Sequence, residues 1–327
     1  MAIAAAEWLE YVDREYLSAF VPGGGAAVKF AIGDPATLSA LRAGLSRSAR
    51  SRSLAYMDLD AAVTRVHMIQ DLFFEIARQV DWYGQSQRLV ERMFARHHYQ
   101  WPNPGAMASF IEIAAMNRVD DTILRRDFNQ WVTAEIGSRP SLASSFRNAA
   151  IQLCRSRLER SAADVAPQDD PVVQWLRGDL KKLSSVTASG IASKINRHNA
   201  RSMLKSLCSW LRLAGTGGLI LVLDIRQLLR DIPPPAGDAR RYGPAAVLDA
   251  YEVLRQMIDD AERFEGLFLV VVADDALLDR DRNPRRSVQN YTALHMRIVS
   301  DVQAATRSNP LAPLVELCDR PLEGAAR

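Results

Sequence analysis

The sequence contains few cysteines, and these are widely spaced. Its three cysteines, Cys154, Cys208 and Cys318, form no pair at the short spacing that zinc sites and redox-active dithiols require. A disulfide framework and a cysteine-based metal site are therefore excluded as organising features. A reducing compartment is the expected setting.

Long hydrophobic runs are also missing. The longest are LILVL at 219–223 and LFLVVVA at 267–273, far short of the ~18 apolar residues that a membrane-spanning helix needs. The first residues, MAIAAAEW, lack the basic residues that begin a secretion signal. We therefore expect a cytoplasmic protein with no membrane partner.

Neither sign of charge is in clear excess. The 41 basic and 38 acidic residues leave a net charge of +3 and are interleaved along the chain. Such a balance does not by itself indicate a nucleic-acid or anionic-membrane partner, so any basic site has to be local. With 327 residues, 48% of them hydrophobic, the chain is long enough for one large domain or two medium ones.

Common catalytic signatures are absent as well. The sequence has no G-x-S-x-G, no H-E-x-x-H and no spaced set of cysteines and histidines. His97 and His98 are adjacent, and adjacent side chains on a helix do not face each other, so they make a poor metal pair. Serine-hydrolase and zinc-protease functions are not indicated.

What the sequence does contain is a set of short, continuously apolar runs in two groups separated by a long helical stretch. Continuous apolar strands that alternate with helices favour a parallel sheet covered on both faces. We predict an α/β domain made of residues 1–60 and 188–327, interrupted by a helical insertion at 61–187. The runs are AAVKFAI (26–32), SLAYMDLD (53–60), GLILVLD (218–224), GLFLVVVAD (266–274) and LAPLVEL (311–317).

The turn after the first run is where a phosphate-binding loop would lie. In such a loop, written G-x-x-x-x-G-K-[ST], glycine amides wrap the phosphates and a lysine neutralises them. Aligned on Gly33, this chain has Leu38, Ser39 and Ala40 where Gly, Lys and Ser/Thr are required. Of the nearby cations, Lys29 lies in the middle of the run and Arg42 lies too far along the following helix to replace the lysine.

Two interpretations of this turn stay open. Asp34 and Pro35 place a negative charge and remove an N–H where an anion would bind, and they are also typical of the N-cap and first position of a helix. The segment is therefore either an ordinary capped helix or a residual nucleotide site. In the second case the candidate contacts are Gly33, Thr37 and Ser39.

The run GLILVLD ends in a candidate metal ligand. Asp224 stands where an aspartate would hold magnesium, but Ile225 follows where many hydrolases have the glutamate that polarises water. Asp224 is thus a magnesium ligand if nucleotide binds, and otherwise a helix cap or a partner for an arginine.

Acidic and basic residues follow the run GLFLVVVAD. Asp274 and Asp275 could bind a metal or act as acid and base, although such pairs are more often a turn and a cap. Two loops rich in arginine are either solvated or form a contact surface for nucleic-acid phosphates or an acidic partner. These residues are Arg240, Arg241, Arg280, Arg282, Arg285 and Arg286.

Four segments resemble the P-loop ATP-binding proteins of bacterial phage-exclusion (BREX-type) and related antiphage defence islands. The resemblance implies a P-loop NTPase-like fold similar to AAA-type and origin-recognition ATPases. It implies that Gly33–Ala40 is the phosphate loop without its lysine, Asp224 the magnesium aspartate, Asp274 the sensor position and Arg297 a candidate arginine. The segments are EWLEYVDREYLSAFVPGGGAAVKFAIG, NARSMLKSLCSWLRLAGTGGLILVLD, AAVLDAYEVLRQMIDDAERFEGLFLVVVA and RRSVQNYTALHMRI.

We therefore predict a catalytically degenerate ATPase-like subunit of a multi-protein antiphage system, with a structural or regulatory role. Its partners would be other subunits, bound through the helical insertion, and DNA, bound through the basic loops. ATP with magnesium is the only cofactor that the resemblance implies, and the degenerate interpretation requires none. The alternatives are a weak or partner-activated ATPase and a DNA-binding accessory factor of the same system.

Overall fold

The computed structural model describes residues 2–159, 166, 168–230, 239–281, 283–299 and 309–319. The chain divides into two compact units. Unit 1 comprises Met1–Leu72 and Thr216–Arg327, and unit 2 comprises Phe73–Gly215. The boundaries expected from the sequence lie near residues 60 and 187 and differ from these. Helix α10 (Ala200–Leu213), expected in the α/β part, belongs to unit 2.

Unit 1 is built around a sheet that has six strands in the described part of the chain. The strand order is β1-β6-β2-β5-β4-β3, and every neighbouring pair is parallel. The predicted α/β fold with a parallel sheet is thus confirmed. The strands are β1 (Ile3–Ala4), β2 (Ala26–Ile32), β3 (Ala55–Asp60), β4 (Leu219–Asp224), β5 (Leu267–Ala273) and β6 (Leu314–Cys318).

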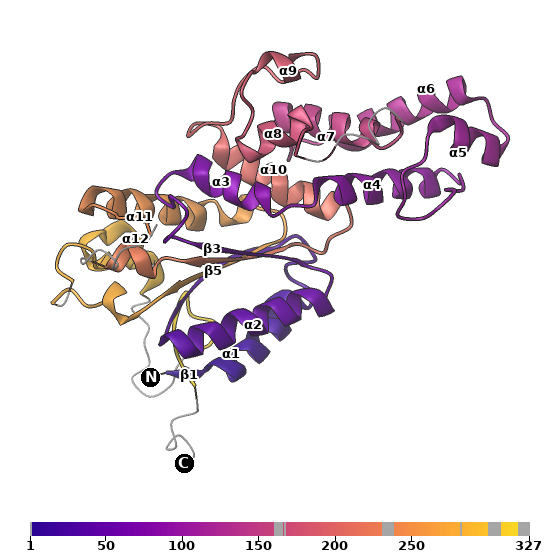
Figure 1. Ribbon diagram of the computed structural model, residues 1–327. Helices are drawn as coiled ribbons and strands as arrows, with labels where there is room; N and C mark the ends of the chain where they lie inside the picture. Colours follow the sequence, from indigo (N-terminus) through magenta and orange to yellow (C-terminus); the bar gives the residue numbers. More distant parts are fainter. Residues whose placement is uncertain are drawn as a thin grey trace. The chain divides into compact units, whose positions relative to one another are not determined.

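Helices cover both faces of this sheet, as Figure 1 shows. Helices α1 (Ala5–Val12) and α2 (Pro35–Ser51) lie on one face, and α11 (Pro244–Asp259) and α12 (Thr292–Ile298) lie on the other. Because both faces are covered, every residue of β4 and β5 is buried. This explains why these two strands are apolar without interruption and do not alternate with polar residues.

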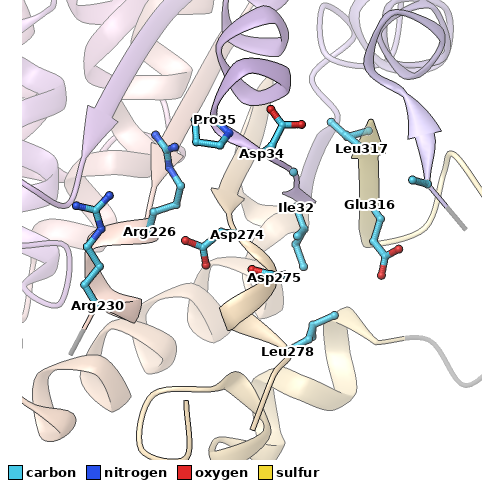
Figure 2. A pocket seen from close by; sticks show the side chains of 12 residues that line it. Ile32, Asp34, Pro35, Arg226, Arg230, Asp274, Asp275, Leu278, Glu316 and Leu317 are labelled. Carbon is cyan, nitrogen blue, oxygen red and sulfur yellow. The ribbon is translucent and has the colours of Figure 1, made fainter. Parts of the chain in front are cut away.

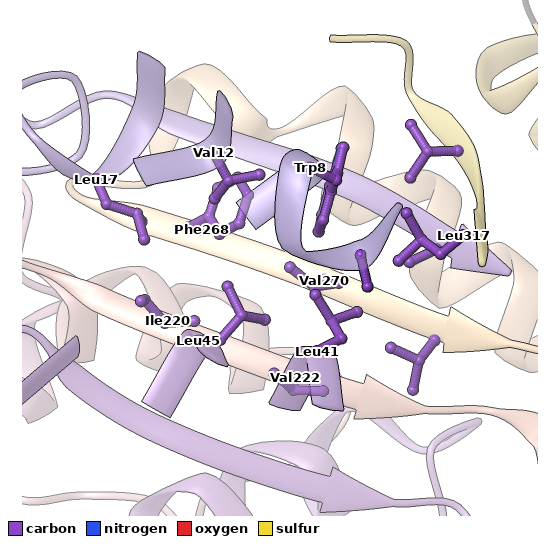
Figure 3. Packing of buried hydrophobic residues seen from close by; sticks show 14 of the residues in the cluster. Trp8, Val12, Leu17, Leu41, Leu45, Ile220, Val222, Phe268, Val270 and Leu317 are labelled. Atoms are coloured by element: carbon purple, nitrogen blue, oxygen red, sulfur yellow. The ribbon is translucent and has the colours of Figure 1, made fainter. Parts of the chain in front are cut away.

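The core on the α1 and α2 side is formed by alternate strand residues (Figure 3). Side chains two residues apart on a strand lie on the same face. Ile220 and Val222 of β4 therefore share this face with Phe268 and Val270 of β5. Trp8 packs against them from α1 with no exposed surface. Full burial of side chains of this kind contributes about 1.5–3 kcal/mol each, which makes this cluster a main source of stability for unit 1.

Lys29 is a buried cation within β2. Its Nζ donates to the carbonyl oxygens of Leu311 at 2.5 Å and Ala312 at 3.3 Å, and it lies 5.0 Å from the centre of the Tyr16 ring. Burial lowers the pKa of Lys29 to about 8. The amine thus fixes the segment that leads into β6, and it lies away from the turn that follows β2.

The regular secondary structure among the described residues of unit 2 is all helical. Helix α3 (Ile69–Arg78) crosses the boundary between the two units. An aromatic cluster stabilises the unit, with Phe94 and Phe128 stacked at 5.7 Å between ring centres. The other α-helices are α4 (Trp82–Arg96), α5 (Phe110–Asn117), α6 (Asp121–Val132), α7 (Ser144–Ser156), α8 (Pro171–Arg177), α9 (Ser184–Thr187) and α10.

Short helical turns connect the longer elements. In the described residues, two of these turns are π-helical and continue α1 and α6. The 3-10 turns follow β4, α11 and β5 or precede α12. They are η1 (Asp13–Leu17), η2 (Thr133–Gly137), η4 (Arg226–Leu229), η5 (Ala261–Arg263), η6 (Asp275–Leu277) and η7 (Val288–Asn290).

Candidate functional site

A cavity of about 630 Å³ lies at the carboxyl ends of the strands in unit 1 (Figure 2). Strands β2 and β5 are neighbours there, and the chain leaves them toward opposite edges of the sheet. Such a reversal of strand order is the usual ligand-binding position in open parallel sheets, and the volume suits a small molecule. The cavity is lined by Ala2, Ile32, Gly33, Asp34, Pro35, Arg226, Arg230, Asp274, Asp275, Leu278, Glu316 and Leu317.

The turn between β2 and α2 is very short. Only Gly33 and Asp34 connect the two elements, because β2 ends at Ile32 and Pro35 already begins the helix. The amide of Gly33 donates to the carbonyl of Ala273 in β5 at 3.3 Å, and a Cβ on Gly33 would lie 3.3 Å from the carbonyl oxygen of Leu317. The remaining positions of the aligned phosphate-loop motif therefore lie in a helix, and no free loop remains to wrap phosphates.

Asp34 caps the first turn of α2. Its Oδ1 accepts from the backbone N–H groups of Ala36 at 2.8 Å and Thr37 at 3.0 Å, and its Oδ2 accepts from the Thr37 hydroxyl at 2.6 Å. The hydrogen bonds from Thr37 hold the pKa of Asp34 below its usual value. A helix N-terminus is the place where this type of fold binds phosphate, and here the chain's own carboxylate takes that place. The expected helix with Asp34 as N-cap and Pro35 at its first position is confirmed.

Asp224 is enclosed by two arginines. Its Oδ2 accepts from Nη2 of Arg42 and from Nη2 of Arg226, both at 2.6 Å, and its Oδ1 accepts from the backbone N–H of Arg226 at 2.9 Å. The residue is only 1% exposed. Burial alone would raise the pKa of Asp224, but the hydrogen bonds and charges of Arg226 and Arg42 hold it below its usual value.

Arg42 links the buried Asp224 at the end of β4 to strand β3. Its Nε lies 3.7 Å from Oδ2 of Asp58, which also accepts from the Tyr56 hydroxyl at 3.1 Å. Burial is the main cause that raises the pKa of Asp58. Arg42 is thus a structural cation between two strands, directed toward Asp224.

The acidic residues after β5 face the cavity. Figure 2 shows Asp274 and Asp275 between the two arginines, Arg226 and Arg230, and the side chain of Ile32. The Oδ1 of Asp274 accepts from the backbone N–H of Ala276 at 3.2 Å, so Asp274 caps η6. Burial raises the pKa of Asp274. The lining carries four carboxylates and two guanidinium groups, which makes the cavity a poor host for a polyanion.

Four of the predicted contact residues do not line the cavity, and Asp224, buried beside it, is one of them. Thr37 is fully buried, and its hydroxyl is bound to Asp34. Ser39 is exposed on α2. Arg297 pairs with Asp259 through two hydrogen bonds, which join α12 to α11.

The predicted basic surface divides into anchored and exposed residues. Arg286 is buried, and its Nη1 donates to the carbonyl of Leu228 at 2.9 Å. Nε of Arg240 donates to the carbonyl of Val63 at 2.5 Å. The exposed members are Arg240, Arg241, Arg280 and Arg285, and Arg282 lies outside the described residues.

Several charged residues that line the cavity or bind Asp224 were not identified from the sequence. Arg226, Arg230 and Glu316 all line the cavity, and Arg42 completes the arginine pair on Asp224. A local signal existed for Arg226, since it stands two residues after Asp224 and its backbone N–H and side chain both bind that carboxylate. The contact of Arg42 with Asp224 joins residues 182 positions apart and has no such signal.

These residues do not fit a magnesium–triphosphate group. Both oxygens of Asp224 already accept hydrogen bonds from arginines, so magnesium would have to displace at least one guanidinium. The helix N–H groups that would bind a phosphate are bound to Asp34. Within the described ranges, no group of three or more His, Cys, Asp or Glu side chains is arranged to hold a metal ion.

None of the helices in the described part of the chain is both long and apolar enough to cross a membrane.

Comparison with known proteins identifies the family. The family model for the BREX system ATP-binding protein BrxC/D matches residues 106–322, more than half of the chain. No curated protein and no solved structure matches significantly. The six-stranded parallel sheet agrees with the P-loop NTPase-like fold that the resemblance implied. The chain belongs to the BrxC/D family of ATP-binding proteins and is a component of a BREX antiphage system.

Proposed function

We propose that this chain is a structural or regulatory subunit of its BREX system and does not hydrolyse ATP. The proposal rests on one observation. Side chains of the protein itself occupy the position where a phosphate would bind and the position where magnesium would bind. Asp34 occupies the N-terminus of α2, and Arg42 and Arg226 occupy the oxygens of Asp224. Repulsion from Asp34 and competition from the two arginines both oppose a bound magnesium–triphosphate.

The residue that would activate water also supports the proposal. Ile225 follows Asp224, is fully buried and has no group that could take a proton. The nearest acid at the sensor position, Asp274, is engaged with the backbone of η6. Phosphoryl transfer depends on positioned charges at the metal, the phosphates and the attacking water. Among the described residues, Asp224 at the metal position is already bound to arginines, and Ile225 leaves no acid at the water position.

A titration with fluorescent ATP and a phosphate-release assay test this function. We expect no magnesium-dependent binding below about 1 mM, and no release above the rate of an Asp224→Asn variant. Turnover that disappears in Asp224→Asn would overturn the proposal, because it would make Asp224 a working metal ligand. Turnover that persists in Asp224→Asn would not arise from this crevice.

A second candidate is a subunit that binds a nucleotide weakly without hydrolysing it. The observation that favours it is the 630 Å³ cavity with Arg226 and exposed Arg230 on its wall. Binding of this kind would not depend on magnesium, and Arg230→Ala would weaken it about tenfold or more, the loss expected when a charge-assisted contact is removed. The same titration, repeated with EDTA, separates this candidate from the first.

A further inference from the structure

Unit 2 contains a second cavity, of about 390 Å³, formed by one end of α5 with α6 and α7. It is lined by two arginines, one amide, one carboxylate and two aromatic rings. Phe128 is fully buried and Phe110 nearly so, so the rings form a rigid apolar wall. The lining residues are Phe110, Arg125, Phe128, Asn129, Arg155 and Glu159.

Arg155 is held in place but not neutralised. Its Nε donates to Oδ1 of Asn129 at 3.0 Å, and Nδ2 of Asn129 donates to the carbonyl of Arg125 at 2.9 Å. Among the described residues, the terminal nitrogens of Arg155 bind no carboxylate. The side chain thus presents its planar donor edge in a fixed orientation, which is the geometry that recognises a carboxylate or a phosphate.

Arg125 provides a second cation in this cavity. Its guanidinium lies 4.6 Å from the centre of the Phe110 ring, a cation–π contact that fixes its orientation. The nearest carboxylate, Asp121, lies 3.5 Å from Nε, and both side chains are more than 40% exposed, so the pair is weak. The lining carries two positive charges against one negative charge, from Glu159.

Nucleic acid is a poorer fit for this cavity than a single carboxylate. A chain of phosphates would also meet Asp121 and Asp127 on α6, whereas one carboxylate would meet only the cavity lining.

We propose that the cavity at Arg125 and Arg155 binds an acidic side chain of a partner subunit. The two guanidinium groups bind its carboxylate. Phe110 contacts its methylene part, whereas Phe128 is fully buried and only supports the wall. This inference rests on the proposed role of the chain as a subunit and identifies the class of partner.

Co-purification from cells that hold the complete BREX locus tests the inference. The tagged full-length chain is compared with an Arg125→Gln, Arg155→Gln double variant, with and without nuclease treatment. The control is Arg126→Gln, on the same helix, since Arg126 is 66% exposed, pairs with Asp127 and does not line the cavity. Melting temperatures of all variants show whether each one is folded.

We expect the double variant to recover at least tenfold less of the other subunits, while Arg126→Gln recovers them fully and nuclease has no effect. A photo-cross-linking residue placed at Glu159, an exposed residue of the cavity lining, should react with a peptide of another subunit that contains Asp or Glu. Unchanged recovery by the double variant would overturn the inference. So would recovery lost on nuclease treatment, a cross-link to nucleic acid, or no subunit recovered by the unaltered chain.

The result is independent of the ATPase assay. Turnover that depends on Asp224 would remove the proposed function and leave the cavity result unaffected. Full recovery by the double variant would remove the partner inference and leave the non-hydrolysing crevice unaffected.

Discussion

Arginines in the two units of this chain are bound in different ways. In unit 1, Arg42 and Arg226 are bound to Asp224, a carboxylate that is almost completely buried. In unit 2, Arg155 is oriented by the amide of Asn129 and binds no carboxylate among the described residues, while Arg125 lies over an aromatic ring and forms only an exposed ion pair with Asp121. An arginine that binds a buried carboxylate stabilises the fold. An arginine that is oriented by an amide or an aromatic ring keeps hydrogen-bond donors for another ligand.

Arg226→Gln should produce the largest effect on this comparison. The change leaves Asp224, which is almost completely buried, with one arginine instead of two, and we expect the free energy of unfolding to fall by about 3 kcal/mol. Urea denaturation measures this change. A loss below about 0.5 kcal/mol, typical of surface positions, would show that Asp224 is solvated and that the comparison is wrong.

The pH dependence of Asp224→Asn sharpens the comparison next. In the folded state the pKa of Asp224 is below 3.8, the usual value for an aspartate. Its ionised form therefore adds stability that is present above that value and is lost as the pH falls through the folded pKa. The difference in unfolding free energy between the unaltered chain and Asp224→Asn should narrow below about pH 4. A difference that widens in acid would contradict the lowered pKa.

Asp34→Ala should have a smaller effect. It removes the acceptor for two backbone N–H groups of α2, and we expect the melting temperature to fall by a few degrees. Asp34→Ser is the matched control, because serine also caps helices but carries no charge. Equal melting temperatures for Asp34→Ala and the unaltered chain would show that the cap contributes little.

Arg155→Gln should have the smallest effect on stability. Since Arg155 neutralises no buried carboxylate, we expect the free energy of unfolding to change by less than about 0.5 kcal/mol. Measured beside Arg226→Gln under the same conditions, it gives the direct contrast between the two kinds of arginine. A loss as large as that of Arg226→Gln would mean that Arg155 is structural.

Much of unit 1 could be predicted from the sequence because its signals are local. Continuous apolar runs indicated strands such as β4 and β5, and the Asp34-Pro35 pair indicated the start of α2. Strand β1 has two residues and was missed, since such a length leaves no pattern. It forms only because β6 offers it a partner at Leu317 and Cys318.

The site was predicted less completely because its chemistry depends on pairs that are distant in the sequence. The alignment found Asp224 but could not show that Arg42 reaches it. Arg285 and Arg286 are adjacent and looked equivalent, yet the fold exposes one and buries the other against Leu228. The sequence resemblance also drew little from the helical stretch, although the family match begins at residue 106 and includes much of it.

The two-residue turn between β2 and α2 limits how this chain could be redesigned. A lysine introduced at Ser39, the aligned lysine position, would lie on the exposed side of α2 and would meet solvent instead of a phosphate held at the turn. Adding glycines by substitution would only weaken the first turn of α2. Under the proposed function, an engineered ATPase would need several residues inserted before Pro35, so chain length at this turn would matter more than side-chain identity.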